Sequence, residues 1–476
     1  MKMSDDSLDK KIKERLSKEI SYIPQDMDKV FNNAINKLKV NRRLKFKRVA
    51  GICAALLTLF IIFDNTITTY ASNIPIISSI LGMFRSNRYE NYDKYSSDLN
   101  LSRESNGIKT TITKVIYDGI ELSIFYIIES EEPMEDIPYF LVKEIKINDN
   151  ITTFGAGEQG RFLDNNKTYS GVISYDVGIN SVVPKEEQEK YLYGGYVEIP
   201  DEFLLSMEIK AIGDIKESKV IEGEWTFNIP VSSEKLKGMV KEYDLNKDLN
   251  SIYEGSKASK LTLTPINTNI QGYITDDYDL YFTVIDDKGR FISPKNGSRN
   301  GGFNTETNNI FYFNYNFKEV FKDTDALTFI PYERNYYKLP SDSSLTDNNV
   351  KEDYQMSSKL NVSGETVLKS RDGRDYITIT RVETSNEKTK LYFKSDYGIL
   401  AAPKKIIDNT TNKEIITIDD FDSKDINASR YLSETDEYVI EFNGELISED
   451  YEIEYYDISE KVTVYNNESF TVKLNK

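Results

Sequence analysis

The side chains that usually carry out chemistry in proteins are scarce in this sequence of 476 residues. It contains no histidine and a single cysteine, Cys53. Ser-His-Asp and Cys-His catalysis both need a histidine, and zinc sites use histidines and several cysteines, so these classes are excluded. One cysteine also excludes a disulfide within the chain. We therefore expect a protein that is not an enzyme and that has no catalytic residues, metal site or cofactor.

Carboxylates are the reactive groups that remain in number, and they cluster in two places. Clustered carboxylates can hold Ca²⁺, but the spacing of an EF-hand, with its turn glycine and terminal glutamate, is absent. We expect both clusters to be solvated acidic loops. They comprise Asp276, Asp277 and Asp279, and Asp419, Asp420, Asp422 and Asp425.

A glycine-rich stretch from Gly297 to Gly302 is a third candidate. Its spacing matches neither of the glycine patterns that bind phosphate groups, and no helical pattern follows it. We expect this stretch to be a loop without a ligand.

The elements that would position any site differ sharply in charge along the chain. Residues 1–48 carry 14 Lys and Arg against 7 Asp and Glu, whereas residues 64–476 carry 46 against 71. A basic head thus precedes a strongly acidic body. The acidic body argues against binding of nucleic acid by the bulk of the chain.

An apolar run separates the head from the body. Val49 to Phe63 is fifteen residues long and its only polar side chain is Thr58. At 1.5 Å per residue it spans about 22 Å, and Tyr70 downstream would suit the membrane interface. The run predicts a transmembrane helix over residues 49–70.

The upstream flank of this run is basic and has no acid. Its seven positive side chains predict that the head lies in the cytoplasm and the body outside the cell, by the positive-inside rule. They would contact lipid headgroups, and we expect no nucleic acid as a partner. These side chains are Lys37, Lys39, Arg42, Arg43, Lys45, Lys47 and Arg48.

The head contains an amphipathic pattern just before this flank. Apolar residues recur at the spacing of one face of an α-helix. Such a short helix buries its apolar face poorly on its own. It either packs within a small helical hairpin or against the bilayer, or it binds a cytoplasmic partner. The face consists of Met27, Val30, Phe31, Ala34, Ile35 and Leu38.

The body has the alternating pattern of β-strands. Two such runs, joined by Asp118-Gly119, predict a β-hairpin from Ile108 to Ile128. Similar Ile-Thr alternations recur around Thr264 and Thr380, at domain-sized spacings. We therefore expect about three consecutive β-sandwich domains.

The predicted fold is thus mainly β, with a short N-terminal helical segment and one transmembrane helix ahead of tandem β-sandwiches. The predicted ranges are a cytoplasmic head (1–48), the transmembrane helix (49–70), a stalk (71–104) and three body domains (105–240, 251–337 and 360–476).

Three segments resemble the bacterial "domain of unknown function 4179" proteins. They are the stretch from Tyr70 to Phe84, the hairpin segment from Asn106 to Ser130, and the strand EWTFNIPV from Glu224 to Val231. The resemblance covers roughly residues 25–235. The rest of the chain is similar to the immunoglobulin-like modules that such proteins often carry at their C-terminus.

The resemblance implies a membrane-bound regulator of a Gram-positive bacterium. Its head would sequester an extracytoplasmic-function sigma factor, and its outer domains would sense the state of the envelope or an extracellular ligand. The zinc-binding His and Cys pattern of some anti-sigma factors is absent, so sigma binding would be metal-free. The alternative is a membrane-anchored surface protein for adhesion or structure, without a role in transcription.

Overall fold

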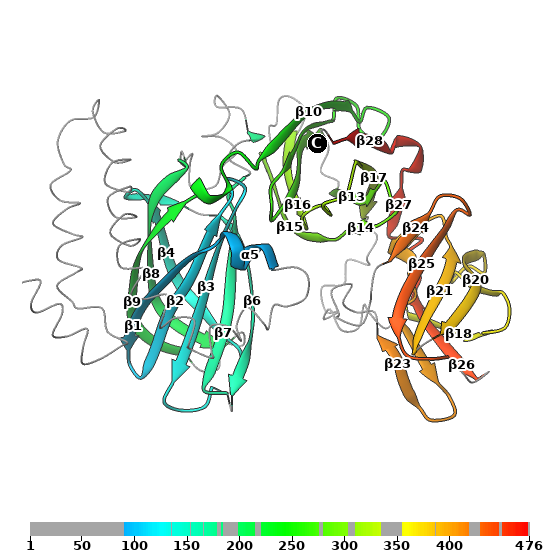
Figure 1. Ribbon diagram of the computed structural model, residues 1–476, viewed down its shortest axis with the longest axis horizontal. Coiled ribbons are helices and arrows are strands. Elements are labelled where there is room, and N and C mark those ends of the chain that lie inside the picture. The colour runs from blue at the N-terminus through cyan, green and yellow to red at the C-terminus, as the bar shows by residue number, and fades with distance from the viewer. Residues whose placement is uncertain are drawn as a thin grey trace, which may run out of the picture. The chain divides into compact units, whose positions relative to one another are not determined.

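The computed structural model shows a chain built mainly from antiparallel β-strands (Figure 1). Its described residues divide into two compact units, one that ends at Met239 and one that begins at Val240. The structure describes residues 90–134, 136–152, 154–164, 166–178, 182–183, 199–214, 220–275, 279–302, 310–334, 355–385, 387–417, 429–446 and 450–474.

The first unit is a β-sandwich whose sheets have the strand orders β1-β2-β3-β7-β6 and β5-β4-β8-β9. Apolar side chains from both sheets meet in one core, as expected when side chains alternate between the two faces of a strand. The strands are β1 (Ser97–Ser105), β2 (Ile108–Tyr117), β3 (Glu121–Ser130), β4 (Pro138–Ile147), β5 (Asn150–Thr152), β6 (Gly155–Asp164), β7 (Thr168–Asp176), β8 (Glu202–Asp214) and β9 (Val220–Ser232). Helix α5 (Glu90–Tyr95) precedes them and the 3-10 turn η1 (Glu234–Leu236) follows.

The predicted hairpin at Asp118-Gly119 is confirmed. Strands β2 and β3 pair antiparallel up to Tyr117 and Leu122. The Asp118 carboxylate accepts the backbone N–H of Ile120 at 2.9 Å, and Gly119 has a φ of 90°, which glycine adopts without steric cost. A local turn signal therefore sets the register of the two central strands.

The core of the first unit contains the only tryptophan of the chain. Trp225 on β9 is fully buried, and its indole N–H donates to the carbonyl of Ile108 on β2 at 2.9 Å. This hydrogen bond satisfies the one polar atom of the ring and joins edge strand β9 of one sheet to β2 of the other.

The second unit contains two more sandwiches, which we call the second and the third sandwich. The second sandwich has one sheet of order β10-β11-β12-β16-β15 and one of order β14-β13-β17-β27, in which β28 also pairs with β17. Its strands are β10 (Lys241–Asp248), β11 (Lys257–Leu263), β12 (Thr268–Ile274), β13 (Asp279–Asp286), β14 (Phe291–Ile292), β15 (Pro294–Gly302), β16 (Ile310–Phe317), β17 (Ala326–Arg334), β27 (Val462–Val464) and β28 (Phe470–Lys473).

The third sandwich lies in the sequence between β17 and β27. Its sheets have the orders β18-β26-β22-β23 and β19-β20-β21-β25-β24 around a separate core. Its strands are β18 (Gln355–Leu360), β19 (Thr366–Lys369), β20 (Asp375–Ser385), β21 (Lys388–Lys394), β22 (Lys405–Asp408), β23 (Lys413–Thr417), β24 (Arg430–Leu432), β25 (Glu437–Asn443) and β26 (Tyr451–Tyr456). The 3-10 turn η3 (Gly398–Ala401) precedes β22, and η4 (Asn466–Glu468) lies between β27 and β28.

The last two strands of the chain return to the second sandwich. Strand β27 pairs with the end of β17, where Arg334 lies opposite Val462, and β28 pairs with its beginning, where Ala326 lies opposite Lys473 (Figure 1). The Phe470 ring stacks on Phe329 with centroids 5.3 Å apart. The third sandwich is therefore an insertion into the second. The domain ranges predicted from the sequence remain predictions.

The helical part of the fold prediction is wrong, and so is the predicted location as a single-pass protein of the cell membrane. In the part of the chain that the structure describes, no helix is long and apolar enough to span a membrane. Helix α5 has six residues, or about 9 Å, against about 20 residues for a span. The predicted head (1–48) and span (49–70) lie outside the described residues. The corrected fold class is mainly β.

We expect Phe470→Ala to lower the free energy of unfolding of the second unit by about 2 kcal/mol. Loss of a fully buried Phe side chain costs about 3–5 kcal/mol, and Phe470 is half-buried. Urea denaturation would measure the loss. Thr471→Ala is the matched control, because this neighbour is exposed, and its effect should stay below about 0.5 kcal/mol. Equal losses would show that β28 does not complete the core.

A buried acid anchors β25 in the third sandwich. The Glu437 side chain is 4% exposed, and Nη1 of Arg381 lies 2.8 Å and 2.6 Å from its two oxygens. Burial would raise the pKa of Glu437, but hydrogen bonds from Thr380 and Arg381 outweigh it and lower the pKa from 4.5 to about 2. The ionised form is therefore the one that the fold stabilises.

We expect this contact to stabilise the third sandwich above about pH 4.5 and to be lost as the pH falls towards 2. The sign follows because the pKa is lower in the folded than in the unfolded chain. Thermal unfolding at pH 7 and pH 3 should show Glu437→Gln destabilised by about 2 kcal/mol at pH 7 and by about half of that or less at pH 3, where part of the contribution of the ionised carboxylate is already lost. Glu434→Gln, an exposed neighbour, should match wild type at both values. An equal deficit of Glu437→Gln at both values would contradict the assignment.

Candidate partner-binding groove

Most residues that the sequence singles out lie outside the described residues. This holds for the predicted partner-binding face, Met27 to Leu38, for the basic flank, Lys37 to Arg48, and for the acidic cluster from Asp419 to Asp425. Asp279 is described and begins β13. The predicted glycine-rich loop is a strand instead, because Gly297 to Gly302 pair with β16 as part of β15.

A groove in the second sandwich is the candidate site that the structure itself presents. It has a volume of about 660 Å³ and is lined by residues 243–248 of β10 and residues 470–473 of β28. These are outer strands of the two different sheets. β10 pairs with β11 alone and β28 with β17 alone among the described residues. Each strand therefore presents one unpaired backbone edge, which is the feature that accepts a further strand.

The floor of the groove is apolar. Every second residue of β10 points towards the core of the second sandwich, and Tyr243 and Leu245 are half-buried there. Phe470 and Val472 do the same from β28. The Tyr243 hydroxyl is buried and has no hydrogen-bond partner among the described residues, which is costly for a polar atom. The floor can thus take apolar side chains.

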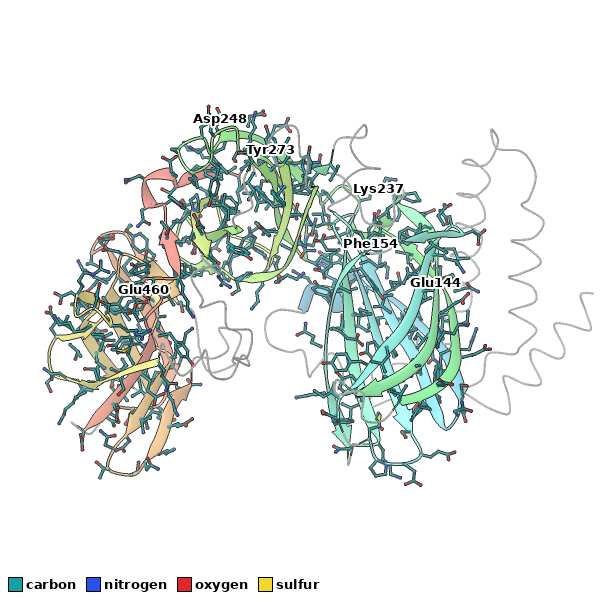
Figure 2. The ribbon with its side chains drawn as sticks, turned by 180° about the vertical axis from the view of Figure 1, so that it is seen from behind. Glu144, Phe154, Lys237, Asp248, Tyr273 and Glu460 are labelled. Atoms are coloured by element: carbon teal, nitrogen blue, oxygen red, sulfur yellow. The ribbon has the colours of Figure 1, made fainter. Side chains whose placement is uncertain are left out.

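The outward row of β10 is acidic. It consists of Glu242, Asp244, Asn246 and Asp248, all exposed, and Figure 2 labels Asp248 on this sandwich. Glu242 pairs with Lys260 at 2.6 Å, whereas Asp244 and Asp248 form no ion pair with a described residue. The groove is lined by Lys247 and Lys473 as well as by Asp244 and Asp248. The two carboxylates at its rim lie opposite Lys260 and Lys257 of β11 without an ion pair to them, so a basic side chain of a partner can pair with them.

A bulge interrupts β10. The pairing with β11 shifts between Asp244 and Lys247, and Asn246 has a φ of 45°. Bulges in edge strands limit uncontrolled sheet extension, and this one leaves Lys241 to Asp244 as the regular part of the edge.

The groove falls in a segment that the sequence leaves between two predicted domains. Residues 241–250 lie between the first and second predicted body ranges, 105–240 and 251–337, and five of the eight residues of β10 are charged. The available signal was the alternation of Tyr243 and Leu245, matched by that of Phe470 and Val472.

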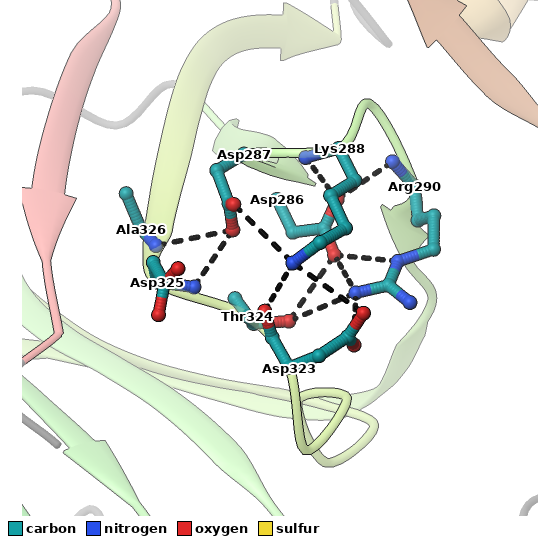
Figure 3. Close-up of polar contacts among 8 residues, drawn as sticks. All are labelled: Asp286, Asp287, Lys288, Arg290, Asp323, Thr324, Asp325 and Ala326. Atoms are coloured by element: carbon teal, nitrogen blue, oxygen red, sulfur yellow. Dashed lines mark hydrogen bonds and ion pairs between the residues drawn. The ribbon is translucent and has the colours of Figure 1, made fainter.

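The densest acidic cluster of the second sandwich lies at the turn after β13 (Figure 3). Asp286 is fully buried, and its carboxylate accepts hydrogen bonds from the backbone N–H groups of Lys288 and Arg290, from the Arg290 guanidinium and from the Thr324 hydroxyl. The Arg290 guanidinium also lies 2.7 Å from Asp323 and stacks over Phe321. The chain's own donors therefore occupy this acid.

The neighbouring carboxylates are occupied in the same way. The backbone N–H of Asp325 holds the pKa of Asp287 below its ordinary value, and the Arg290 side chain does so for Asp323. Across the described residues no group of three or more acidic or cysteine side chains is arranged to hold a metal ion. The cluster is a clamp on the turn rather than an open ligand site.

The clamped turn carries the contact to the third sandwich. Gly289, with a φ of 74°, accepts the backbone N–H of Tyr431 at 2.6 Å, and a Cβ atom there would lie 1.8 Å from the Tyr431 carbonyl oxygen. Phe291 stacks on Tyr438 of the third sandwich, with centroids 6.1 Å apart. Only glycine allows this approach, so the cluster positions the junction within the second unit.

We expect Asp286→Ala to lower the unfolding free energy of the second unit by about 3 kcal/mol, because it leaves the Arg290 guanidinium without its buried partner. Asp323→Ala removes the exposed partner of the same guanidinium and should cost far less. Urea denaturation compares the two variants. A larger loss for Asp323→Ala would mean that the buried acid does not hold the turn.

Comparisons with known proteins give two family matches. The domain of unknown function DUF4179 matches residues 41–130, and the family of unknown function DUF5643 matches residues 240–369. The second match contains β10, whereas β28 lies beyond it. No curated protein matches the chain.

Among the solved structures that are similar to the chain is the conserved domain protein from Bacillus anthracis. It is 27% identical over 52% of this chain and 81% of its own, with a TM-score of 0.38. The resemblance to the DUF4179 family is thus confirmed over residues 41–130, and residues 240–369 match the DUF5643 family, both of unknown function.

Proposed function

We propose that the chain is a regulator that acts by binding other polypeptides: its N-terminal head binds a sigma factor and its β-sandwich body binds a second polypeptide. The observation that carries the second part of this proposal, binding by the body, is the groove of the second sandwich. Its walls are two unpaired strand edges over an apolar floor, which is how β-domains take up extended polypeptides.

The acidic cluster at the turn after β13 does not offer an open catalytic group. A general acid or base needs a titrating group that can reach a substrate. Asp286 is fully buried and bound by Arg290 and Thr324, so its carboxylate is closed to a substrate. The backbone edges of β10 and β28 are open instead, and they offer recognition without chemistry.

The sigma factor is proposed from the head. The apolar face from Met27 to Leu38 has the spacing of an amphipathic helix, which binds in a groove of its partner. The DUF4179 match begins at residue 41, so this face lies upstream of it. Since the chain has no histidine and one cysteine, binding would not depend on zinc.

We expect a sigma factor to co-purify with the full chain from its own bacterium, and Phe31→Asp to reduce its recovery at least tenfold, because a carboxylate would enter the apolar contact. Asn33→Asp introduces the same charge off the predicted face and is the matched control. Quantitative mass spectrometry of the eluates measures recovery. Equal recovery with Phe31→Asp, or no sigma factor with the wild type, would overturn the proposal.

A further inference from the structure

We propose that the groove between β10 and β28 binds an extended polypeptide strand that alternates apolar and basic side chains and pairs with the free edge of β10. The inference rests on the proposed binding function of the body and names the chemistry of its partner. The β10 edge, the groove floor and the acidic rim carry it in turn.

The backbone of β10 supplies the pairing. Strand β11 occupies one edge of β10, and the other edge has no strand partner among the described residues. Residues Lys241 to Asp244 are regular before the bulge, so an added strand can form main-chain hydrogen bonds over this short stretch. Because only a few residues pair, we expect the partner strand to bind reversibly.

The floor selects one face of the added strand. A strand beside β10 points every second side chain the same way as Tyr243 and Leu245, towards Phe470 and Val472 across the groove. These four side chains are half-buried, so an apolar side chain placed among them removes apolar surface from water on both partners.

The rim selects the other face. Side chains directly opposite one another on neighbouring strands lie on the same side of the sheet and interact. The outward row of β10 contains Glu242, Asp244 and Asp248, and the last two have no ion pair among the described residues. A Lys or Arg opposite Asp244 would pair with it within the regular stretch, and Asp248, beyond the bulge, adds negative charge to the same row. Charge complementarity therefore specifies a basic outward row.

A second copy of β10 fits the edge poorly. If two copies pair antiparallel with their outward rows on one side of the sheet, Glu242 lies opposite Asp248, or Asp244 lies opposite itself or Asp248. Like charges directly opposite one another destabilise a strand pair. The acidic row that attracts a basic strand thus also disfavours self-association through this edge.

The test uses the full chain and a fluorescent synthetic peptide that alternates Lys and Val. Fluorescence anisotropy measures its affinity. We expect saturable binding, at least tenfold stronger than that of a Glu-Val peptide. A Lys-Val peptide with N-methylated backbone amides has the same charge, but its backbone cannot donate hydrogen bonds along either edge. It should bind at least tenfold more weakly than the unmethylated Lys-Val peptide. Equal binding of the methylated peptide would mean plain charge attraction and would overturn the inference.

Variants of the chain locate the site. The double change Asp244→Lys and Asp248→Lys should weaken binding of the Lys-Val peptide at least tenfold. Glu224→Lys, an exposed acid on the first unit, should leave it unchanged. Thermal unfolding of each variant checks that the fold is intact. Bound peptide should also slow hydrogen exchange at the β10 amides. A dimer through β10, or peptide binding unaffected by the double change, would overturn the inference.

The two proposals fail separately. Loss of peptide binding to β10 with retained, Phe31-dependent recovery of the sigma factor would remove only this inference. Peptide binding at β10 without a sigma factor in the eluate would remove the proposed role of the head and leave the groove.

Discussion

The pairing of the last strands of the chain with β17 is the constraint on which the second unit depends. β27 and β28 extend the sheet of β13 and β17, and Phe470 and Val472 fill the side of the core next to β10. The same pairing brings Arg334 and Val462 side by side, so the third sandwich leaves and returns at one place. The pairing of β27 and β28 with β17 thus completes the core of the second sandwich and anchors the third sandwich.

The same closure creates the candidate site. Because β28 is short and β10 ends its own sheet, the two sheets meet along this side without a strand that joins them. The turn at Asp286 contrasts with these unpaired strand edges, because local hydrogen-bond donors occupy its buried carboxylate. Polar groups that the fold satisfies hold its shape, and the backbone groups that it leaves unpaired are available to a partner.

Local features of the fold could be predicted from the sequence and long-range ones could not. The hairpin at Asp118-Gly119 follows from alternation and a turn signal. Strand β15 is hidden because its glycines and polar residues lack a strand pattern. The pairing of β28 with β17 joins segments more than a hundred residues apart and leaves no local signal. An apolar run predicts a spanning helix, whereas the described residues contain none, and the predicted sigma-binding face lies outside them.

The insertion of the third sandwich also orders events during synthesis. Strand β17 leaves the ribosome well before β28, because residues 335–469 are translated in between. At about 5–20 residues per second, this interval lasts on the order of ten seconds. During that time the edge of β17 lacks its pairing with β28, and the core around Phe329 lacks Phe470. A nascent chain of this protein therefore presents to chaperones an unfinished sheet edge that the completed chain conceals.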